Sequence, residues 1–227
     1  MEITIVLVKF IKDIQVRLEA IPSPGAIIYN ALIKIILSKA ELRIAQEIIQ
    51  KIDKGILVDV GSGTGFLSIE IAKRAPKLKI YGIDLSRKMV EIASGNARRF
   101  NNIKFKLANA IDLPFENNSI DIIVSTGSFH HWKQPFKVFN ECYRVLKDGK
   151  EAWIYDGCSK PPNWEIIKLK QNYGMFRYHI LNQIQKLHGF PWEVYNTRIK
   201  RLLERTKFKK NFQMILTDGW MKIALKK

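Results

Sequence analysis

The segment ILVDVGSGTGF, residues 56–66, is the most informative part of the sequence. Its first half is a run of apolar and β-branched residues, which is typical of a buried strand. Its second half places Gly61, Gly63 and Gly65 two residues apart. Glycine lacks a Cβ, so the backbone can turn with positive φ and a ligand can lie directly against the amides that open the next helix. The segment therefore predicts a strand, a ligand-binding loop and a helix.

The acid in front of the glycines indicates which ligand the loop binds. Dinucleotide enzymes favour GxGxxG, whereas this loop reads GxGxG, includes Ser62 and follows Asp59. A carboxylate at the strand end would repel a pyrophosphate, but it suits a ligand that carries an ammonium and a sulfonium. The charge therefore favours S-adenosylmethionine, and the alternative is a glycine-rich turn without a ligand.

A second acid supports a nucleoside ligand. Residues 79–83 predict a strand that ends at Asp84, 19 residues after Gly65. In a βαβ unit this spacing brings the end of the second strand beside the loop after the first. The Asp84 carboxylate could accept both ribose hydroxyls, and Leu85 would flank the adenine. The alternative is a solvated acid at a strand end.

Three segments together resemble a known family. ILVDVGSGTGF, YGIDLS at residues 81–86 and RVLKDGKEAWIYD at residues 144–156 are similar to motifs of the class I S-adenosylmethionine-dependent methyltransferases, in particular the ubiquinone and menaquinone type. The resemblance covers roughly residues 56–156. It implies an α/β, Rossmann-like, doubly wound sheet of seven mostly parallel strands, with S-adenosylmethionine as methyl donor and S-adenosylhomocysteine as product.

The resemblance also implies roles for individual residues. The glycine loop and Asp59 would hold the methionine end of the donor. Asn109, followed by Ala110, stands where the family usually has an aspartate that accepts a hydrogen bond from the adenine amino group. An asparagine carbonyl can still accept that bond. Thr126 and Gly127, after the predicted strand 120–125, would face the reacting methyl group.

A histidine pair follows that strand in the segment TGSFHHW, residues 126–132. Doubly wound folds bind ligands at this edge of the sheet. His130 and His131 are therefore candidates for a general base. The alternative is that both imidazoles hydrogen-bond to the backbone and shape the pocket.

Aromatic residues are frequent between Trp153 and Tyr195. In the resembling family an insertion after the fifth strand commonly covers the substrate, so residues 158–191 are expected to form a lid. An aromatic wall suits an apolar acceptor, although such residues also build cores. The residues expected to contact the substrate are Tyr29, Trp132, Trp164 and Tyr173.

The whole chain, residues 1–227, is expected to form one domain. Residues 1–54 would form an N-terminal cap, residues 55–157 the cofactor-binding core and residues 192–227 a C-terminal helix and antiparallel hairpin. The apolar N-terminus carries Glu2 and lacks a cleavage site, and no apolar run is long enough to span a bilayer. These features predict a cytoplasmic protein. Cys142 and Cys158 lack the spacing of a disulfide framework or a metal site.

The net charge of +17 is unevenly distributed. Residues 158–227 hold 15 basic and 4 acidic residues, a net +11, whereas residues 111–157 hold 5 and 7. Such a surface could meet nucleic acid, an anionic membrane or an acidic substrate, or it could reflect compositional bias. The absence of NPPY-like and Pro-Cys motifs favours a small-molecule acceptor over nucleic acid. The alternatives are an RNA methyltransferase and a non-catalytic S-adenosylmethionine-binding module, and the oligomeric state stays open.

Overall fold

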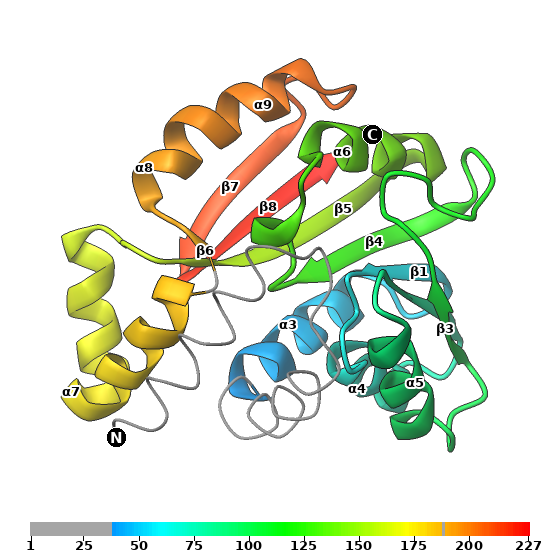
Figure 1. Cartoon of the computed structure of the whole chain (residues 1–227), viewed down its shortest axis with the longest axis horizontal. Helices are drawn as coiled ribbons and strands as arrows, with labels where there is room; N and C mark the ends of the chain where they lie inside the picture. Colours follow the sequence, from blue (N-terminus) through cyan, green and yellow to red (C-terminus); the bar gives the residue numbers. More distant parts are fainter. Residues whose placement is uncertain (1–37, 188) are drawn as a thin grey trace.

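The computed structural model describes residues 38–187 and 189–227 (Figure 1). Seven strands form one sheet in the order β3-β2-β1-β4-β5-β8-β7, and the two-residue strand β6 pairs with the end of β5. Strands β1 to β5 are mutually parallel along this path, whereas β8 is antiparallel to both β5 and β7. The strands are β1 (Gly55–Val60), β2 (Leu78–Asp84), β3 (Ile103–Leu107), β4 (Ile120–Thr126), β5 (Leu146–Cys158), β6 (Gly189–Phe190), β7 (Phe212–Thr217) and β8 (Trp220–Lys226).

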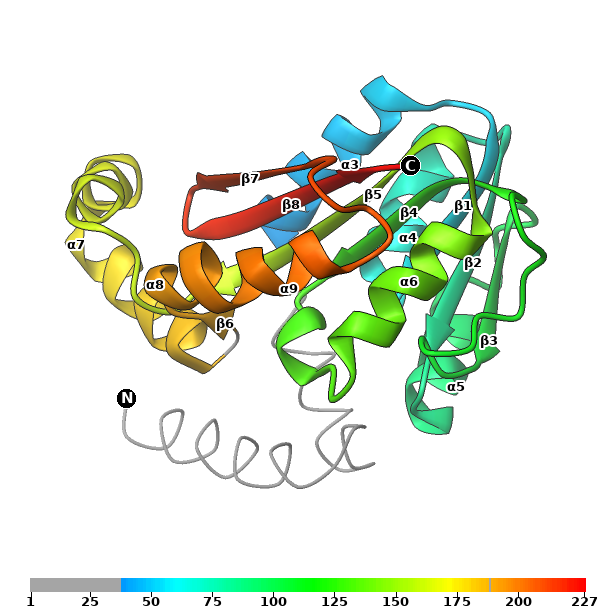
Figure 2. The same cartoon turned by 90° about the horizontal axis from the view of Figure 1, so that it is seen from above.

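Helices cover both faces of the sheet, with α3 and α4 on one side and α6 and α9 on the other (Figure 2). Each side has its own apolar core, because alternate residues of a strand point to opposite faces. In β1, Leu57 belongs to the core under α3 and α4, and Val58 belongs to the core under α6 and α9. The helical elements are α3 (Ser38–Lys51), α4 (Phe66–Arg74), α5 (Arg87–Asn96), η1 (Phe129–His131), α6 (Pro135–Val145), α7 (Asn163–Leu187), α8 (Trp192–Val194), η2 (Tyr195–Ile199) and α9 (Lys200–Arg205).

The fold confirms the expected Rossmann-like sheet with its C-terminal antiparallel hairpin. The glycine loop lies between β1 and α4, as the sequence predicts. The hairpin turns at Asp218 and Gly219, and β8 inserts between β5 and β7. The predicted edge is therefore made by β7 alone, with β8 one position further in.

Two elements differ from the bounds that their sequences predict. Residues 87–100 predict one helix after Ser86, whereas α5 ends at Asn96, where Gly95 and Asn96 are weak helix formers. Asp148 and Gly149 predict a turn before a strand, whereas the structure places this turn as an excursion within β5, because Ile120 pairs with Leu146 and Ile122 pairs with Glu151. Gly149 has a φ of 73°, which supplies the turn conformation expected of it.

The expected cap and lid are only partly within the described residues. Tyr29 and the rest of residues 1–37 lie outside them. The segment 158–191 contains the end of β5, helix α7 and strand β6. Helix α7 is broken at Gly174, whose φ of 73° and ψ of 162° are not helical.

No helix in the part of the chain that the structure describes is long and apolar enough to cross a membrane. Cys142 and Cys158 are free and buried thiols, and burial raises the pKa of each to about 12.

Candidate functional site

The glycine loop is held against the end of β2. The backbone amides of Gly61 and Ser62 both donate to the carbonyl of Ile83, at 2.8 and 3.0 Å. The amide of Gly63 donates to Oδ2 of Asp84 at 2.8 Å. The loop and the end of the second strand are therefore one hydrogen-bonded unit, as the βαβ spacing predicts.

The three glycines of the loop differ in what surrounds them. All three have positive φ, between 54° and 79°. A Cβ on Gly61 would lie 2.5 Å from Oγ of Ser128, and one on Gly65 would lie 2.5 Å from Cζ of Phe105. A Cβ on Gly63 would meet nothing within 4 Å. Gly61 and Gly65 thus permit close packing, whereas Gly63 borders open space.

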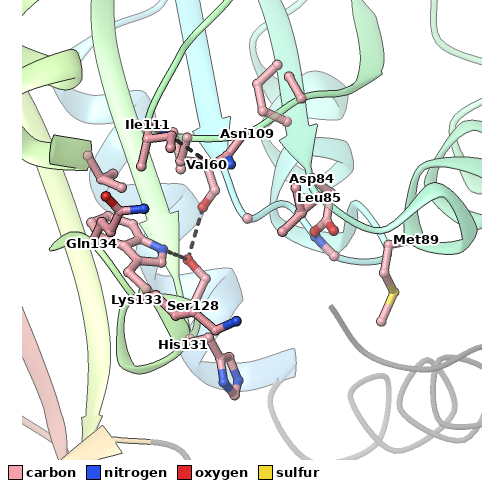
Figure 3. Close-up of a pocket in the computed structure, with 18 of the residues that line it drawn as sticks. Val60, Asp84, Leu85, Met89, Asn109, Ile111, Ser128, His131, Lys133 and Gln134 are labelled. Carbon is pink, nitrogen blue, oxygen red and sulfur yellow. Dashed lines mark hydrogen bonds between the residues drawn. The ribbon is translucent and has the colours of Figure 1, made fainter. Parts of the chain in front are cut away.

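A cleft opens at the carboxyl ends of β1, β2 and β4 (Figure 3). Asp84 and Leu85 lie on one side, and Ser128 and His131 lie on the opposite side. Ten of the residues singled out in the sequence line it. They are Gly61, Gly63, Asp84, Leu85, Asn109, Ala110, Thr126, Gly127, His131 and Trp132.

Asp84 holds the backbone of both the glycine loop and the segment that follows β2. Its Oδ2 accepts the Gly63 amide, and its Oδ1 accepts the Ser86 amide at 2.8 Å. Burial raises the pKa of this carboxyl, while hydrogen bonds from the Ser86, Gly63 and Leu85 amides oppose that rise. Two amides fix the orientation of the carboxylate, and its remaining lone pairs can accept hydroxyl donors.

Asp59 does not line the cleft, although the sequence suggested direct access. Its side chain is 1% exposed and points to the α4 side of the sheet, where Ser68 donates to Oδ2 at 2.7 Å. Its Oδ1 has no hydrogen-bond partner among the described residues. Burial raises the pKa of Asp59 to about 7. The hydrogen bond from Ser68 opposes this rise, and the negative charge of Asp84 adds to it.

Asn109 is exposed at the cleft, where its Oδ1 accepts the amide of Ile111 at 3.2 Å. This short-range bond fixes the side chain in one orientation, as in an Asx turn. Ser62 and Gly65, which the sequence also suggested as ligand contacts, belong to the loop but not to the cleft lining.

Ser128 is a central residue of the site that the sequence reasoning missed. Its hydroxyl lies 2.7 Å from that of Ser125, donates to the carbonyl of Val60 at 3.2 Å and accepts from Nε1 of Trp132 at 3.2 Å (Figure 3). These contacts join the ends of β1 and β4 and orient the Trp132 indole. The serine lies inside the segment TGSFHHW, but nothing in that pattern distinguishes it.

The two histidines have different environments. His130 is tied to Asp156 of β5, whose carboxylate accepts the His130 backbone amide at 2.8 Å and whose Oδ1 lies 2.8 Å from its Nδ1. Asp156 is 1% exposed and the His130 side chain 8% exposed. His131 lines the cleft, and its ring lies 3.8 Å from that of His130, centroid to centroid. Only one of the two predicted imidazoles therefore lines the cleft.

Of the three expected substrate contacts within the described residues, one lines the cleft. Trp132 lines it, but Trp164 and Tyr173 on α7 do not. Trp164 is 54% exposed and contacts Trp192 edge-on. Tyr29 lies outside the described residues, and its role stays a prediction. Within the described residues, no group of three or more His, Cys, Asp or Glu side chains could hold a metal ion.

Comparison with known proteins identifies the domain. Residues 52–218 match the model of a family described as a methyltransferase domain. The demethylmenaquinone methyltransferase of Porphyromonas gingivalis is 29% identical over 61% of this chain and 57% of its own length. That of Thermotoga maritima is 35% identical over 44% of this chain and 43% of its own length. The chain thus spans about half the length of these relatives.

A solved structure resembles this chain over most of its length. It is a crystal structure of a candidate S-adenosyl-L-methionine-dependent methyltransferase of Methanococcus maripaludis. The two chains are 26% identical and superpose with a TM-score of 0.71, over 90% of this chain and 93% of the other. The resemblance therefore extends well beyond the cofactor-binding motifs.

Proposed function

Because the chain belongs to the class I S-adenosylmethionine-dependent methyltransferases, we propose that it transfers the donor's methyl group to a small-molecule acceptor in the cleft between Asp84 and His131. The observation that carries the proposal is the cleft itself. It joins the glycine loop, the acid at the end of β2 and the segment after β4 in one concave site. The names of the curated relatives, which methylate demethylmenaquinone, support a small molecule.

The residues present fit the methyl donor. Gly63 borders open space, so a ligand can approach its backbone closely. Asp84 offers a carboxylate of fixed orientation that can accept hydroxyl groups. Asn109 offers an amide at the same cleft. The donor supplies an electrophilic methyl group on a sulfonium. These features favour an orientation in which the adenosine end of the donor lies between Asp84 and Asn109. The reacting methyl group then points toward Thr126 and His131.

The chain's own contribution is alignment and exclusion of water. Methyl transfer disperses positive charge, so it requires an acceptor atom held in line with the donor bond rather than a covalent protein intermediate. Ser128 fixes the indole of Trp132 through its hydroxyl and thereby shapes the acceptor side of the cleft. Close packing of Gly61 on Ser128 holds the donor side and the acceptor side of the cleft in a fixed relative position.

His131 is the proposed proton acceptor. It lines the cleft, whereas the imidazole of His130 is turned to Asp156. In the neutral form, an Nδ1–H of His130 donated to Asp156 leaves its Nε2 as an acceptor. His130 is therefore proposed as a positioning residue, which packs against His131 and anchors η1 to β5.

RNA as acceptor is the second candidate, and one surface favours it. In residues 198–210 seven side chains are basic and one is acidic, and all eight are exposed. None of these seven cations forms an ion pair within residues 38–187 and 189–227.

A non-catalytic binding module would have the same donor site, and only turnover distinguishes it.

The proposal is tested by transfer of tritiated methyl groups from S-adenosylmethionine into a fractionated cell extract. Small-molecule, lipid, RNA and protein fractions are counted separately, with heat-inactivated protein as the control. Label in a small-molecule or apolar lipid fraction is the expected result. Label confined to RNA, or no label despite measurable donor binding, would overturn it.

A further inference from the structure

Strand β7 forms an outer edge of the sheet, beyond β8 (Figure 2). Among the residues that the structure describes, β8 is the only strand that pairs with it. The amides and carbonyls of an edge strand that point away from its neighbour can pair with another chain. No described residue of β7 lines the cleft, so the methyl-transfer site leaves this edge unused.

The hydrogen bonds of the hairpin determine which backbone groups point outward. The amide of Lys226 donates to the carbonyl of Asn211 at 2.9 Å. In an antiparallel pair, alternate residues exchange hydrogen bonds with the neighbouring strand. The odd-numbered residues of β7 therefore bond to β8. Phe212, Met214 and Leu216 direct their amides and carbonyls to the outer edge.

The sequence of β7 lacks the usual protection of an edge strand. Soluble proteins commonly place charges or proline on such strands, which discourages pairing with other chains. The opposite edge strand, β3, follows this rule, because Lys104 and Lys106 are exposed on it. None of the six residues of β7, FQMILT, is charged or proline, and Ile215 is 48% exposed. Of the two edges, β7 is therefore the one suited to pairing.

The charges that flank β7 favour an antiparallel partner of the same sequence. Lys209 and Lys210 are exposed just before the strand, and Asp218 lies in the turn just after it. Two copies of β7 aligned in parallel would bring their basic ends together. Antiparallel copies related by a two-fold axis instead place the basic end of one strand beside the acidic end of the other.

We propose that β7 pairs with β7 of a second copy of this chain, antiparallel about a two-fold axis at Met214. The two sheets then become one continuous sheet across the dimer, and Lys210 lies opposite Asp218 of the second copy. One strand pair buries little surface, so the dimer is weak and its population rises with protein concentration. The proposal does not depend on the identity of the methyl acceptor.

The position of the axis sets the register of the two strands. Phe212 lies opposite Leu216 of the second copy, and the two Met214 residues face each other. Every pair that exchanges backbone hydrogen bonds across the dimer therefore consists of outward-facing residues. Ile215 lies opposite Gln213 of the second copy, and the two exposed Ile215 side chains become diagonal neighbours on one face of the sheet.

An extended segment of another protein is the main alternative occupant of this edge. It would bond to the same backbone groups, but it would leave the isolated chain monomeric. A second β7 has matching length and opposite charge at each flank, and these two properties favour a second copy.

The first test is amide hydrogen exchange of the full chain, followed by NMR at low and high protein concentration. Pairing should slow exchange severalfold at the amides of Phe212, Met214 and Leu216 as the concentration rises. The odd-numbered amides of β7 already bond to β8 and should change less. The amides of β3 are the internal control and should not change. This alternation requires no variant.

Sedimentation equilibrium tests the same contact with two variants. Ile215→Lys places a charge on the exposed face of β7, twice in each dimer, and should raise the dissociation constant about tenfold. The matched control is Leu107→Lys on β3, where the side chain is 46% exposed. It should leave the dissociation constant unchanged. Circular dichroism checks that both variants fold.

Three outcomes would overturn the proposal. The first is exchange at the three outward-facing amides that does not depend on protein concentration. The second is a dimer that Ile215→Lys and Leu107→Lys weaken equally, because its contact would then lie elsewhere. The third is protection of the outward-facing amides only when an unrelated extended peptide is added, because the edge would then bind a foreign segment.

Discussion

Gly61 and Ser128 pack so closely that a single added methyl group cannot fit between them. A Cβ on Gly61 would lie 2.5 Å from both Cβ and Oγ of Ser128, and Gly61 also has a φ of 71°. The residues are 67 positions apart in sequence, yet their contact joins the loop after β1 to the loop after β4. The cleft is formed across this contact.

Gly61→Ala should therefore lower both stability and donor affinity. The methyl group must displace Ser128, and alanine resists a positive φ, so we expect a loss of stability on the order of 1–3 kcal/mol. Urea unfolding and calorimetry with S-adenosylhomocysteine measure the two effects. The matched control is Gly95→Ala in α5, where nothing lies within 4 Å and which should be neutral or stabilising. Unchanged affinity in Gly61→Ala would separate the contact from the binding site.

Asp84→Ala should weaken donor binding through loss of acceptors for the ribose hydroxyls. We expect a decrease of roughly 1–3 kcal/mol for one to two hydrogen bonds. Titration with S-adenosylhomocysteine measures the loss, and Asp148→Ala serves as the control because that side chain is 87% exposed in the β5 excursion. NAD should not bind to either protein. Binding of NAD, or full affinity in Asp84→Ala, would contradict the assignment.

Asn109 allows a test of the adenine contact. If its carbonyl accepts the adenine amino group, Asn109→Asp should bind S-adenosylhomocysteine about as tightly as wild type, because both side chains offer an acceptor. Asn109→Leu should bind less tightly. Both variants are compared by the same titration, and the exposed position makes misfolding a minor concern. Equal affinity in all three proteins would remove Asn109 from the site.

The histidine pair should separate into two roles. His131→Ala is expected to lose turnover on the order of a hundredfold with little change in donor affinity, as removal of a general base does. His130→Ala should mainly lower the unfolding temperature, because it leaves the buried Asp156 without its imidazole partner. Turnover is measured on the fraction that accepts label. Wild-type turnover in both variants would exclude a general-base role for either imidazole.

The basic segment 198–210 decides between the two acceptor classes. We expect RNA binding at physiological salt to be weak and independent of sequence, and to weaken with salt at a log–log slope of about −0.7 per contacted phosphate. Arg201→Glu with Arg205→Glu should reduce this binding, whereas the exposed pair Lys77→Glu with Lys79→Glu should reduce it less. Filter binding over a salt series measures both. Tight binding of one particular RNA would favour the RNA candidate.

The part of the fold that could be predicted from sequence is the part with local signals. Alternation of apolar strands and amphipathic helices, with glycines and acids at strand ends, indicates a doubly wound sheet because each feature reports on its own element. The bounds of α5 and β5 were harder to predict. Helix ends depend on weak differences in propensity, and the excursion in β5 is set by its register with β4.

The same distinction between local signals and contacts among distant segments holds for the candidate site. Residues at strand ends, such as Asp84 and Asn109, line the cleft because a motif places them there. The direction of a side chain is a different matter. His130 turns to Asp156, Asp59 points away from the cleft, and Ser128 joins two loops, all through contacts between distant segments. No spacing in the sequence encodes such contacts.

The position of β8 between β5 and β7 has a consequence for how the chain folds during synthesis. Strand β8 follows β7 along the chain, yet it lies between β5 and β7, and about 70 positions separate it from its pairing partners in β5. Until β8 leaves the ribosome, β5 has an open edge and β7 has no neighbour in the sheet. Residues 38–158 can assemble the five parallel strands first, and the nascent domain then exposes an unprotected edge of β5 until β8 pairs with it.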